Sequence, residues 1–338
     1  MSRAADALVF TGVGELERRP VTVDAPGPKE VTIRTMVSAI SPGTELLLYR
    51  GELPAEIAAD IGVEATADAV TYPTPYGYAL VGEVTETGEA VEDVTVGQRV
   101  FAFHPHQTQC TVNADAVVPL SEDLSAAAGA MLPTVETATN FLMDGQPRIG
   151  ERVVVFGAGV IGLWTTRLLA AFPVTVTVVE PIARRRRLAD AMGADRTVPP
   201  EAVDDLYADR APPGADLVYE VSGQPAALDD AIDAVGYDGR IIVGYTLTFN
   251  GYFGGIVDGD FIATVVVVFR RVTDTNVSVS DFQAVIHIVI SVGGHIVKRV
   301  FKTPVEHCLR STTDLWWSRG GSIRTEVSMC TKVECTLN

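Results

Sequence analysis

Three glycines between an apolar segment and a helical segment constrain this chain more than any other feature of its sequence. Gly157, Gly159 and Gly162 have the spacing G-x-G-x-x-G and directly follow the apolar run 153–156. The first glycine permits a tight turn, the second lets the backbone approach a pyrophosphate, and the third lets helix and strand pack closely. An acidic residue, Glu180, lies 18 residues beyond Gly162, at the end of the next apolar segment. This context predicts a Rossmann dinucleotide-binding unit rather than an isolated turn.

The residues around this loop are expected to bind a nicotinamide dinucleotide. Its pyrophosphate would meet the free N–H groups and the positive end of the helix that begins after Gly159. A carboxylate at Glu180 accepts ribose hydroxyls and repels a 2′-phosphate, which favours NAD. Arg185, within the arginine run 184–187, leaves NADP open, because these arginines either bind a 2′-phosphate or form the solvated face of a helix. The predicted contacts are Gly157, Gly159, Val160, Ile161, Gly162, Glu180 and Arg185.

Strands and helices alternate on both sides of the loop. Such alternation predicts right-handed crossovers and a parallel sheet covered on both faces. The segment from residue 7 to about 119 instead shows short β-strands broken by Gly and Pro. We therefore expect an α/β protein with a β-rich domain at 1–120 and a Rossmann doubly wound domain at 121–245. The expected strands are 153–156, 174–179, 216–221 and 240–245, and the expected helices are 160–171, 184–192 and 226–235.

The charge of the chain excludes some partners. Its formal net charge is -17 and its pI is near 4.7, so its surface repels nucleic acid and anionic membranes. Residues 1–245 hold 35 acidic and 17 basic side chains, and Lys29 is the only lysine there. Such a bias is typical of halophilic proteins, because concentrated salt screens the repulsion among carboxylates. The alternative is an ordinary acidic cytosolic protein.

Cysteine usage and the amino terminus indicate a cytoplasmic protein. The four cysteines are too few and too scattered for a disulfide framework or a four-cysteine zinc lobe. Asp6 and Glu15 stand where a signal peptide would need an apolar stretch, and the longest apolar run, 262–269, is too short to span a bilayer. We expect a soluble protein that acts on a small molecule.

The composition changes abruptly near residue 245. Residues 246–338 hold nine basic and eight acidic side chains and only two alanines. The runs 265–268 and 285–290 are candidate strands, but no recognisable motif accompanies them. A reading-frame shift would produce this simultaneous loss of acidity, alanine and motif, and a genuine divergent tail is the alternative. We leave 246–338 unassigned.

Two motifs in the first half resemble the medium-chain dehydrogenase/reductase superfamily, in its zinc-type alcohol dehydrogenase-like group. The family's C-G-[ST]-D corresponds to Pro42-Gly43-Thr44-Glu45, and its G-H-E-x-x-G-x-V corresponds to 77–84. The resemblance covers about 7–245 and implies that the β-rich domain is GroES-like. The stretch 41–45 also resembles the bacteriochlorophyllide-dehydrogenase-like members more weakly. The resemblance adds three residues near the nicotinamide: Thr137, Ser222 and Gly223.

The zinc ligands of that family are replaced here. The three mapped positions hold Pro42, Tyr78 and Pro133, and zinc needs Cys, His or carboxylate donors. An alternative site could begin at the H-x-H pair His104 and His106, but Pro105 distorts a strand and no third donor is evident. The resemblance therefore implies a zinc-independent branch, and we expect no metal.

Without zinc, hydrogen-bond donors must stabilise the charge that develops on the substrate oxygen. The catalytic candidates are Thr44, Tyr78, His104 and Glu45, with His106 as an alternative proton carrier and Glu45 as an orienting group. Each has a structural alternative: Thr44 could cap a helix at 45–49, and Tyr78 could merely fill the zinc cavity.

These features predict an NAD(P)-dependent, zinc-independent dehydrogenase or reductase acting on an alcohol, carbonyl or enone. Its oligomeric state would be a homodimer or homotetramer, as the resemblance implies. The alternative is a non-catalytic or truncated dehydrogenase-like protein that keeps the nucleotide fold without turnover. Fluorescence titration with NADH and NADPH separates the two classes.

Overall fold

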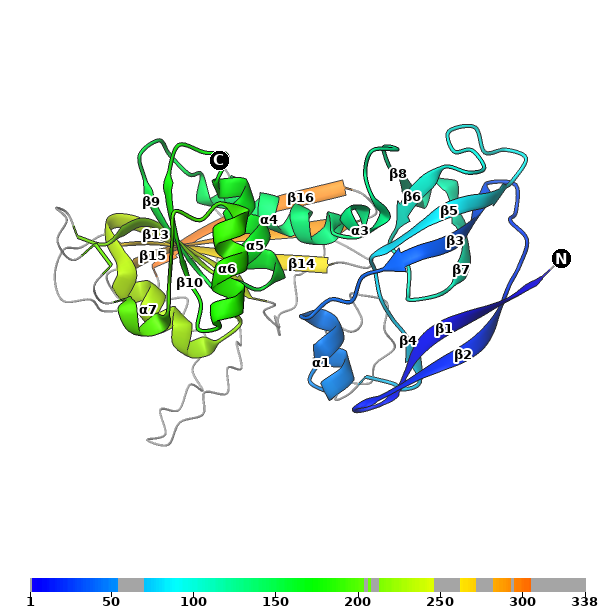
Figure 1. Cartoon of the computed structure of the whole chain (residues 1–338), viewed down its shortest axis with the longest axis horizontal. Coiled ribbons are helices and arrows are strands. Elements are labelled where there is room, and N and C mark those ends of the chain that lie inside the picture. Colours follow the sequence, from blue (N-terminus) through cyan, green and yellow to red (C-terminus); the bar gives the residue numbers. More distant parts are fainter. Residues whose placement is uncertain are drawn as a thin grey trace. The chain divides into compact units, whose positions relative to one another are not determined.

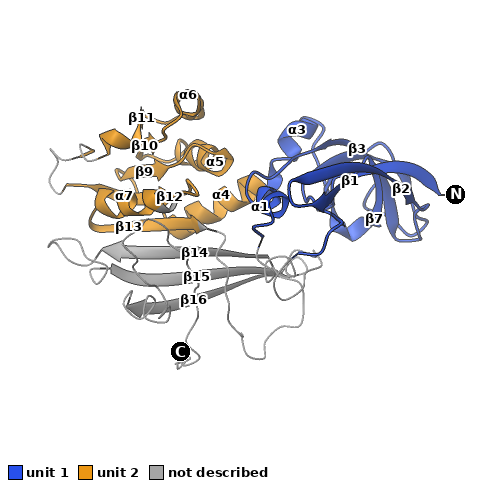
Figure 2. Ribbon diagram, turned by 90° about the horizontal axis from the view of Figure 1, so that it is seen from below, with its two compact units in different colours: residues 1–133 blue, residues 134–338 orange. Residues whose placement is uncertain are grey.

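The computed structural model describes residues 2–53, 70–203, 206–207, 213–245, 262–271, 282–292 and 295–304. The chain forms two compact units, Met1–Pro133 and Thr134–Asn338, which Figure 2 colours separately. Among the described residues, no helix is long and apolar enough to cross a membrane.

The first unit is built from two antiparallel sheets. One has the order β2-β1-β4, and the other has the order β7-β3-β5-β6-β8. Val31 and Ile33 of β3 are fully buried against Leu80 and Val84 of β5, so alternate residues fill a core as a half-buried sheet requires. The bounds are β1 Arg3–Gly12, β2 Glu15–Val23, β3 Glu30–Ser38, β4 Thr74–Pro75, β5 Leu80–Thr87, β6 Arg99–Ala102, β7 Gln109–Asn113, β8 Val117–Pro119, η1 Ala114–Ala116 and α1 Thr44–Arg50. This confirms the β-rich domain.

The first unit extends beyond residue 120, where we expected the domain boundary, and ends at Pro133. The reason is the short helix α3 (Ala126–Gly129), which packs on the β-sheet. A Cβ at Gly129 would lie 2.5 Å from Leu120 Cδ1 and 3.4 Å from Val81 Cγ2. The alanine-rich segment 126–129 therefore belongs to the first unit, although it is helical like much of the second unit.

The second unit contains the predicted parallel sheet. Five strands have the order β11-β10-β9-β12-β13 and pair in parallel. The chain moves outward from β9 to β11 and returns to β12, so the strand order reverses between β9 and β12 (Figure 2). Figure 1 shows helices α5, α6 and α7 of this unit beside the sheet. The bounds are α4 Leu132–Gly145, β9 Arg152–Phe156, α5 Val160–Leu169, β10 Thr175–Val179, α6 Ala183–Met192, β11 Arg196–Val198, η2 Pro200–Ala202, β12 Ala215–Glu220, α7 Pro225–Ala234 and β13 Val235–Tyr245. The α/β class is confirmed.

Helices cover both faces of this parallel sheet. Val153 and Val155 of β9 pack in a core with α4, α5 and α6, which contribute residues such as Phe141 and Leu169. The alternate residue Val154 packs in the opposite core with Ala231 of α7. A strand buried on both faces needs a continuous apolar run, and 153–156 supplies it.

The strands β14 (Ile262–Arg271), β15 (Phe282–Val292) and β16 (His295–Pro304) continue the same sheet beyond β13. Each pairs antiparallel with its neighbour, beginning with Tyr245 opposite Val265. The candidate strands 265–268 and 285–290 thus lie within β14 and β15. The sheet is parallel as far as β13 and antiparallel beyond it.

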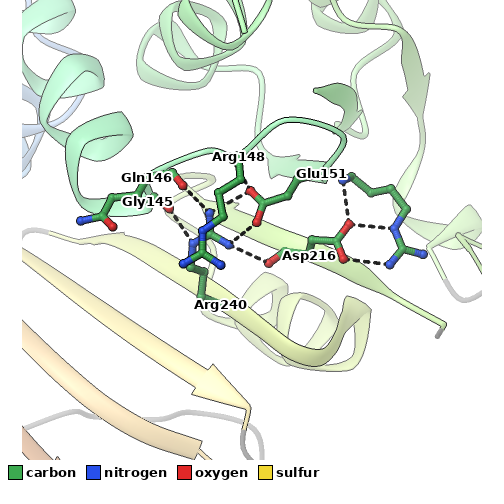
Figure 3. Close-up of polar contacts among 7 residues, drawn as sticks. Gly145, Gln146, Arg148, Glu151, Asp216 and Arg240 are labelled. Atoms are coloured by element: carbon green, nitrogen blue, oxygen red, sulfur yellow. Dashed lines mark hydrogen bonds and ion pairs between the residues drawn. The ribbon is translucent and has the colours of Figure 1, made fainter. Parts of the chain in front are cut away.

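Arg240, near the start of the parallel strands, forms hydrogen bonds with several segments of the second unit (Figure 3). Arg240 of β13 donates from Nη1 and Nη2 to the two carboxylate oxygens of Glu151, at 2.8 and 2.9 Å. It also donates to the carbonyl oxygens of Gly145 and Gln146, at 2.5 and 2.7 Å. The side chains of Arg240 and Glu151 are each only 12% exposed. This cluster fixes the connection between α4 and β9 at the edge opposite the glycine loop.

Candidate functional site

The glycine loop has the geometry that its spacing predicts. Gly157 has φ +95°, and a Cβ there would lie 2.6 Å from Ser222 Cα. A Cβ at Gly162 would lie 1.9 Å from the Gly157 carbonyl oxygen. Gly159 has extended backbone, with φ -71° and ψ -175°, and a Cβ there would meet nothing within 4 Å. The first and third glycines are therefore needed for packing, and the second leaves open space in front of the backbone.

The helix α5 begins at this open space. Its N-cap is Gly159, which makes no side-chain capping bond, and Val160 and Ile161 form its first turn. The first N–H groups of a helix have no intrahelical partner and carry its positive end. The loop thus presents N–H donors where the sequence predicted a pyrophosphate site.

Glu180 lies at the end of β10 and contacts the glycine loop. Its carboxylate is buried and accepts the Ala158 N–H at Oε2 and the Ile182 N–H at Oε1, at 2.8 and 2.9 Å. A carboxylate offers about four acceptor positions, so both oxygens retain capacity for further donors. Arg185 lies with Nη1 3.9 Å from Glu180 Oε2, and its side chain is 50% exposed. The acidic and basic groups that we predicted for ribose recognition are therefore adjacent.

Ser222 and Gly223 lie beside the loop, just beyond β12. The Ser222 N–H donates to Glu220 Oε1 at 2.9 Å, and its hydroxyl donates to the same oxygen. Gly223 has φ +70°, which places it in the left-handed region. These residues follow β12, next to the reversal of strand order where ligands of doubly wound sheets bind. Thr137 lies half-buried on α4.

A second group of polar residues occurs in the first unit. Glu45, in the first turn of α1, is buried and accepts the Ser41 N–H at Oε1, at 2.9 Å. Its Oε2 lies 2.8 Å from Nε2 of His106, which is also buried. The other ring nitrogen of His106, Nδ1, lies 2.5 Å from the Ser38 hydroxyl. These contacts join three segments that are far apart in the sequence.

Thr44 and Tyr78 lie next to Glu45. Burial raises the pKa of Tyr78, the Ser41 hydrogen bond partly lowers it, the Glu45 charge raises it, and the Thr44 hydrogen bond partly lowers it. The net shift is upward, so Tyr78 is a neutral phenol near pH 7. The N-cap of α1 is Gly43 and makes no side-chain capping bond, so the expectation that Thr44 caps this helix is wrong.

His104 and His106 have separate surroundings. His104 is half-buried, and its Nδ1 lies 2.9 Å from the Pro105 carbonyl oxygen. Burial lowers the pKa of His104, and this hydrogen bond partly offsets the effect. The histidine that contacts Glu45 is thus His106, which the sequence offered only as an alternative. Within the described ranges, no group of three or more His, Cys, Asp or Glu side chains could hold a metal ion.

The fold and these two groups define a class of protein, in which a β-rich unit precedes a Rossmann unit with a complete glycine loop. Residues 27–144 match the alcohol dehydrogenase GroES-like domain, and residues 160–249 match the zinc-binding dehydrogenase domain. The chain is 27% identical over 289 residues to L-threonine 3-dehydrogenase of Pyrococcus furiosus, covering 75% of this chain and 76% of that protein.

Two further comparisons agree. The chain is 29% identical over 204 residues to (R,R)-butanediol dehydrogenase of Bacillus subtilis, spanning 51% of this chain and 59% of that protein. A putative zinc-binding dehydrogenase from Sinorhizobium meliloti, solved bound to NADP, has a TM-score of 0.61 and 22% identity, covering 73% of this chain and 80% of that one. The chain belongs to the medium-chain dehydrogenase/reductase superfamily, a family of oxidoreductases. Both family matches end before residue 250.

Proposed function

We propose that this protein is an NAD(P)-dependent oxidoreductase that transfers hydride between a nicotinamide cofactor and an alcohol, carbonyl or enone without a zinc ion. The observation that carries the proposal is the glycine loop. Gly157 and Gly162 are held by contacts that exclude a Cβ, whereas Gly159 faces open space at the start of α5. A loop of this form has the shape that a pyrophosphate requires.

The residues present fit a nicotinamide dinucleotide. The N–H groups of Val160, Ile161 and Gly162 would bind the pyrophosphate, and Glu180 would accept the adenosine ribose hydroxyls. The nicotinamide would supply the hydride acceptor or donor, and the protein would supply position and charge stabilisation. Glu180 favours NAD, because its buried carboxylate would repel a 2′-phosphate. Arg185, close to that carboxylate, keeps NADP as the second choice.

The residues present do not fit zinc at the position that the family uses. The side chains of Pro42 and Pro133 have no donor atom, and Tyr78 is a half-buried phenol already hydrogen-bonded to Ser41 and Thr44. Zinc takes at least three Cys, His or carboxylate donors in catalytic sites. We infer instead that the Tyr78 and Thr44 hydroxyls donate to the substrate oxygen, where charge develops during hydride transfer. Burial, together with the charge of the adjacent Glu45, raises the pKa of Tyr78 and keeps it protonated.

Fluorescence titration of the full chain with NADH and NADPH, in concentrated salt, tests the proposal. We expect saturable binding of both cofactors, tighter for NADH, followed by NADH oxidation with members of a carbonyl and enone panel. Absence of binding to either cofactor would refute the proposal. Binding without turnover on any substrate would favour a non-catalytic nucleotide-binding protein.

A further inference from the structure

We propose that Ser38, His106 and Glu45 form a proton relay for this hydride transfer, with His106 as the group that stores the proton. The inference rests on the proposed function and adds Ser38, which no sequence motif contains, to His106 and Glu45. Its basis is one continuous chain of hydrogen bonds in the first unit, from the Ser38 hydroxyl through the imidazole to the Glu45 carboxylate.

The hydrogen bonds assign a direction to this chain. A carboxylate only accepts, so Glu45 Oε2 requires a proton on His106 Nε2. In the neutral ring, Nδ1 is then an acceptor, and the Ser38 hydroxyl donates to it across 2.5 Å. This arrangement resembles a Ser–His–acid triad, in which the acid orients the imidazole and stabilises the imidazolium. Ser38 is the group poised to pass a proton to the ring.

Burial also orders the three residues. Glu45 is 3% exposed and His106 is 7% exposed, whereas Ser38 is half-buried. Ser38 is thus the most exposed of the three residues, and the pair of His106 and Glu45 is shielded from water. Within a buried environment the attraction between imidazolium and carboxylate is stronger than in water, so the pair can hold a proton that the substrate releases.

The backbone around the ring fixes its orientation next to Tyr78. Gly77 has φ +135°, and a Cβ there would lie 2.8 Å from His106 Cδ2. The His106 N–H donates to the Tyr76 carbonyl oxygen at 3.2 Å, and the Leu8 N–H of β1 donates to the His106 carbonyl oxygen at 2.9 Å. The ring is therefore packed directly against the residue that precedes Tyr78.

The hydrogen bonds and contacts of the ring leave the His106 imidazole as the group of this cluster that can take up a proton. Glu45 reaches the ring from α1 and the uncharged Ser38 reaches it from β3. Gly77, which lies between Tyr76 and Tyr78, packs against it from the segment before β5. Burial raises the pKa of both tyrosines, so they remain neutral near pH 7. The imidazole is therefore the proton carrier of this group, because either of its ring nitrogens can bind a proton.

In alcohol oxidation, a bound oxidised nicotinamide would accept hydride from the substrate carbon, and the substrate O–H bond would break as the carbonyl forms. The released proton passes to the Ser38 oxygen, directly or through one water. The proton of the Ser38 hydroxyl moves to His106 Nδ1, so that Ser38 is unchanged and His106 becomes imidazolium beside Glu45. Carbonyl reduction runs the same steps in reverse.

The test compares His106→Phe, His106→Gln and Ser38→Ala in the full chain. His106→Phe keeps a ring against Gly77 but removes both nitrogens. His106→Gln keeps a donor for Glu45 and an acceptor for Ser38, yet it cannot carry a proton. Thr32→Val is the matched control, because Thr32 lies on the same strand as Ser38 but outside the relay. Its buried hydroxyl hydrogen-bonds to Thr111 Oγ1 at 3.0 Å.

We expect kcat for alcohol oxidation to fall by about 10²–10⁴-fold in both His106 variants, with a change in the pH dependence of kcat. NADH affinity should stay unchanged, and Thr32→Val should keep wild-type rates. Retention of kcat and of the pH profile by His106→Gln would overturn the relay, because a purely structural imidazole can be replaced by an amide. If His106→Phe does not fold, Ser38→Ala tests the relay in its place, and it should show the same fall in kcat. Failure of the proposed function is seen separately, as absence of hydride transfer in the wild-type protein.

Discussion

Replacing Gly159 with Asp should separate cofactor binding from stability. Gly159 is the N-cap of α5, its backbone is extended, and a Cβ there would meet nothing within 4 Å. Asp is a favoured N-cap residue, and it differs from Gly there by only a few tenths of a kcal/mol. The Gly159→Asp variant should therefore fold as stably as the wild-type protein, or slightly more stably.

The same substitution should abolish dinucleotide binding. Two unit charges of like sign about 4 Å apart repel by about 4 kcal/mol at an effective dielectric constant of about 20. A carboxylate at Gly159 would stand at about that distance from the pyrophosphate, so the affinity for NADH should fall about 1,000-fold from charge alone. Gly159→Asn is the control, because it has the same shape and capping ability without the charge.

The assay is fluorescence titration with NADH, paired with urea unfolding of each variant. The Asp and Asn variants should have similar midpoints of unfolding, and both should bind more weakly than wild type because any Cβ intrudes on the phosphate path. The Asp variant should be weaker still, by the factor derived above. Wild-type NADH affinity in Gly159→Asp would refute the assignment of the loop.

Three further predictions concern stability and reactivity. Arg240→Met should lower the free energy of unfolding by about 3–5 kcal/mol in urea denaturation, because it leaves the Glu151 carboxylate buried without its partner; a loss under about 1 kcal/mol would contradict this. Burial acts to raise the pKa of Asp216, but the hydrogen bonds and charge of Arg152 outweigh it and lower the pKa. The stability that Asp216 contributes is therefore present above its unfolded pKa of about 3.9 and is lost as pH falls through the lower folded value. Asp216→Asn should accordingly be less stable than wild type at neutral pH, with the difference shrinking in acid unfolding, and a constant difference would argue against the ion pair. Burial raises the pKa of Cys110 to about 12, so this thiol should not react with a thiol-specific reagent at pH 8 until the protein is unfolded. Peptide mapping distinguishes Cys110 from the other three cysteines, and rapid labelling of Cys110 in the native protein would show that it is accessible.

The glycine loop could be predicted from the sequence because its determinants are local. A strand, a turn and the start of a helix lie within 152–169, and the spacing of Gly157, Gly159 and Gly162 sets all three backbone requirements. The position of Glu180 could also be predicted from the sequence, because a parallel crossover has a characteristic length and ends at the same edge of the sheet. Its bond to the Ala158 N–H could not be predicted, since it depends on a side-chain conformation.

The role of His106 was harder to predict because its partners are distant in sequence. Glu45 lies 61 positions before it and Ser38 lies 68 positions before it. An H-x-H pair on a strand would direct both rings to one face, but β6 ends at Ala102, so neither histidine lies in a strand. With the strand periodicity lost, the sequence could not distinguish His104 from His106.

Two strands in the last part of the chain could be predicted from the sequence, but their pairing could not. The candidate strands at 265–268 and 285–290 lie within β14 and β15, but their antiparallel pairing had no signal in the sequence. The composition changes at 246, and the second family match ends at 249. The hypothesis of a reading-frame shift remains a prediction, and sequencing of the gene on both sides of codon 245 tests it.

Turnover by metal-free protein decides whether hydride transfer in this protein needs zinc. The protein is treated exhaustively with a chelator, its zinc content is measured, and NADH oxidation is followed with the carbonyl and enone panel. The motif correspondence maps the family's zinc ligands onto Pro42, Tyr78 and Pro133, so we expect full activity in protein that contains only traces of zinc. Loss of activity on chelation, with recovery in proportion to added zinc, would contradict it.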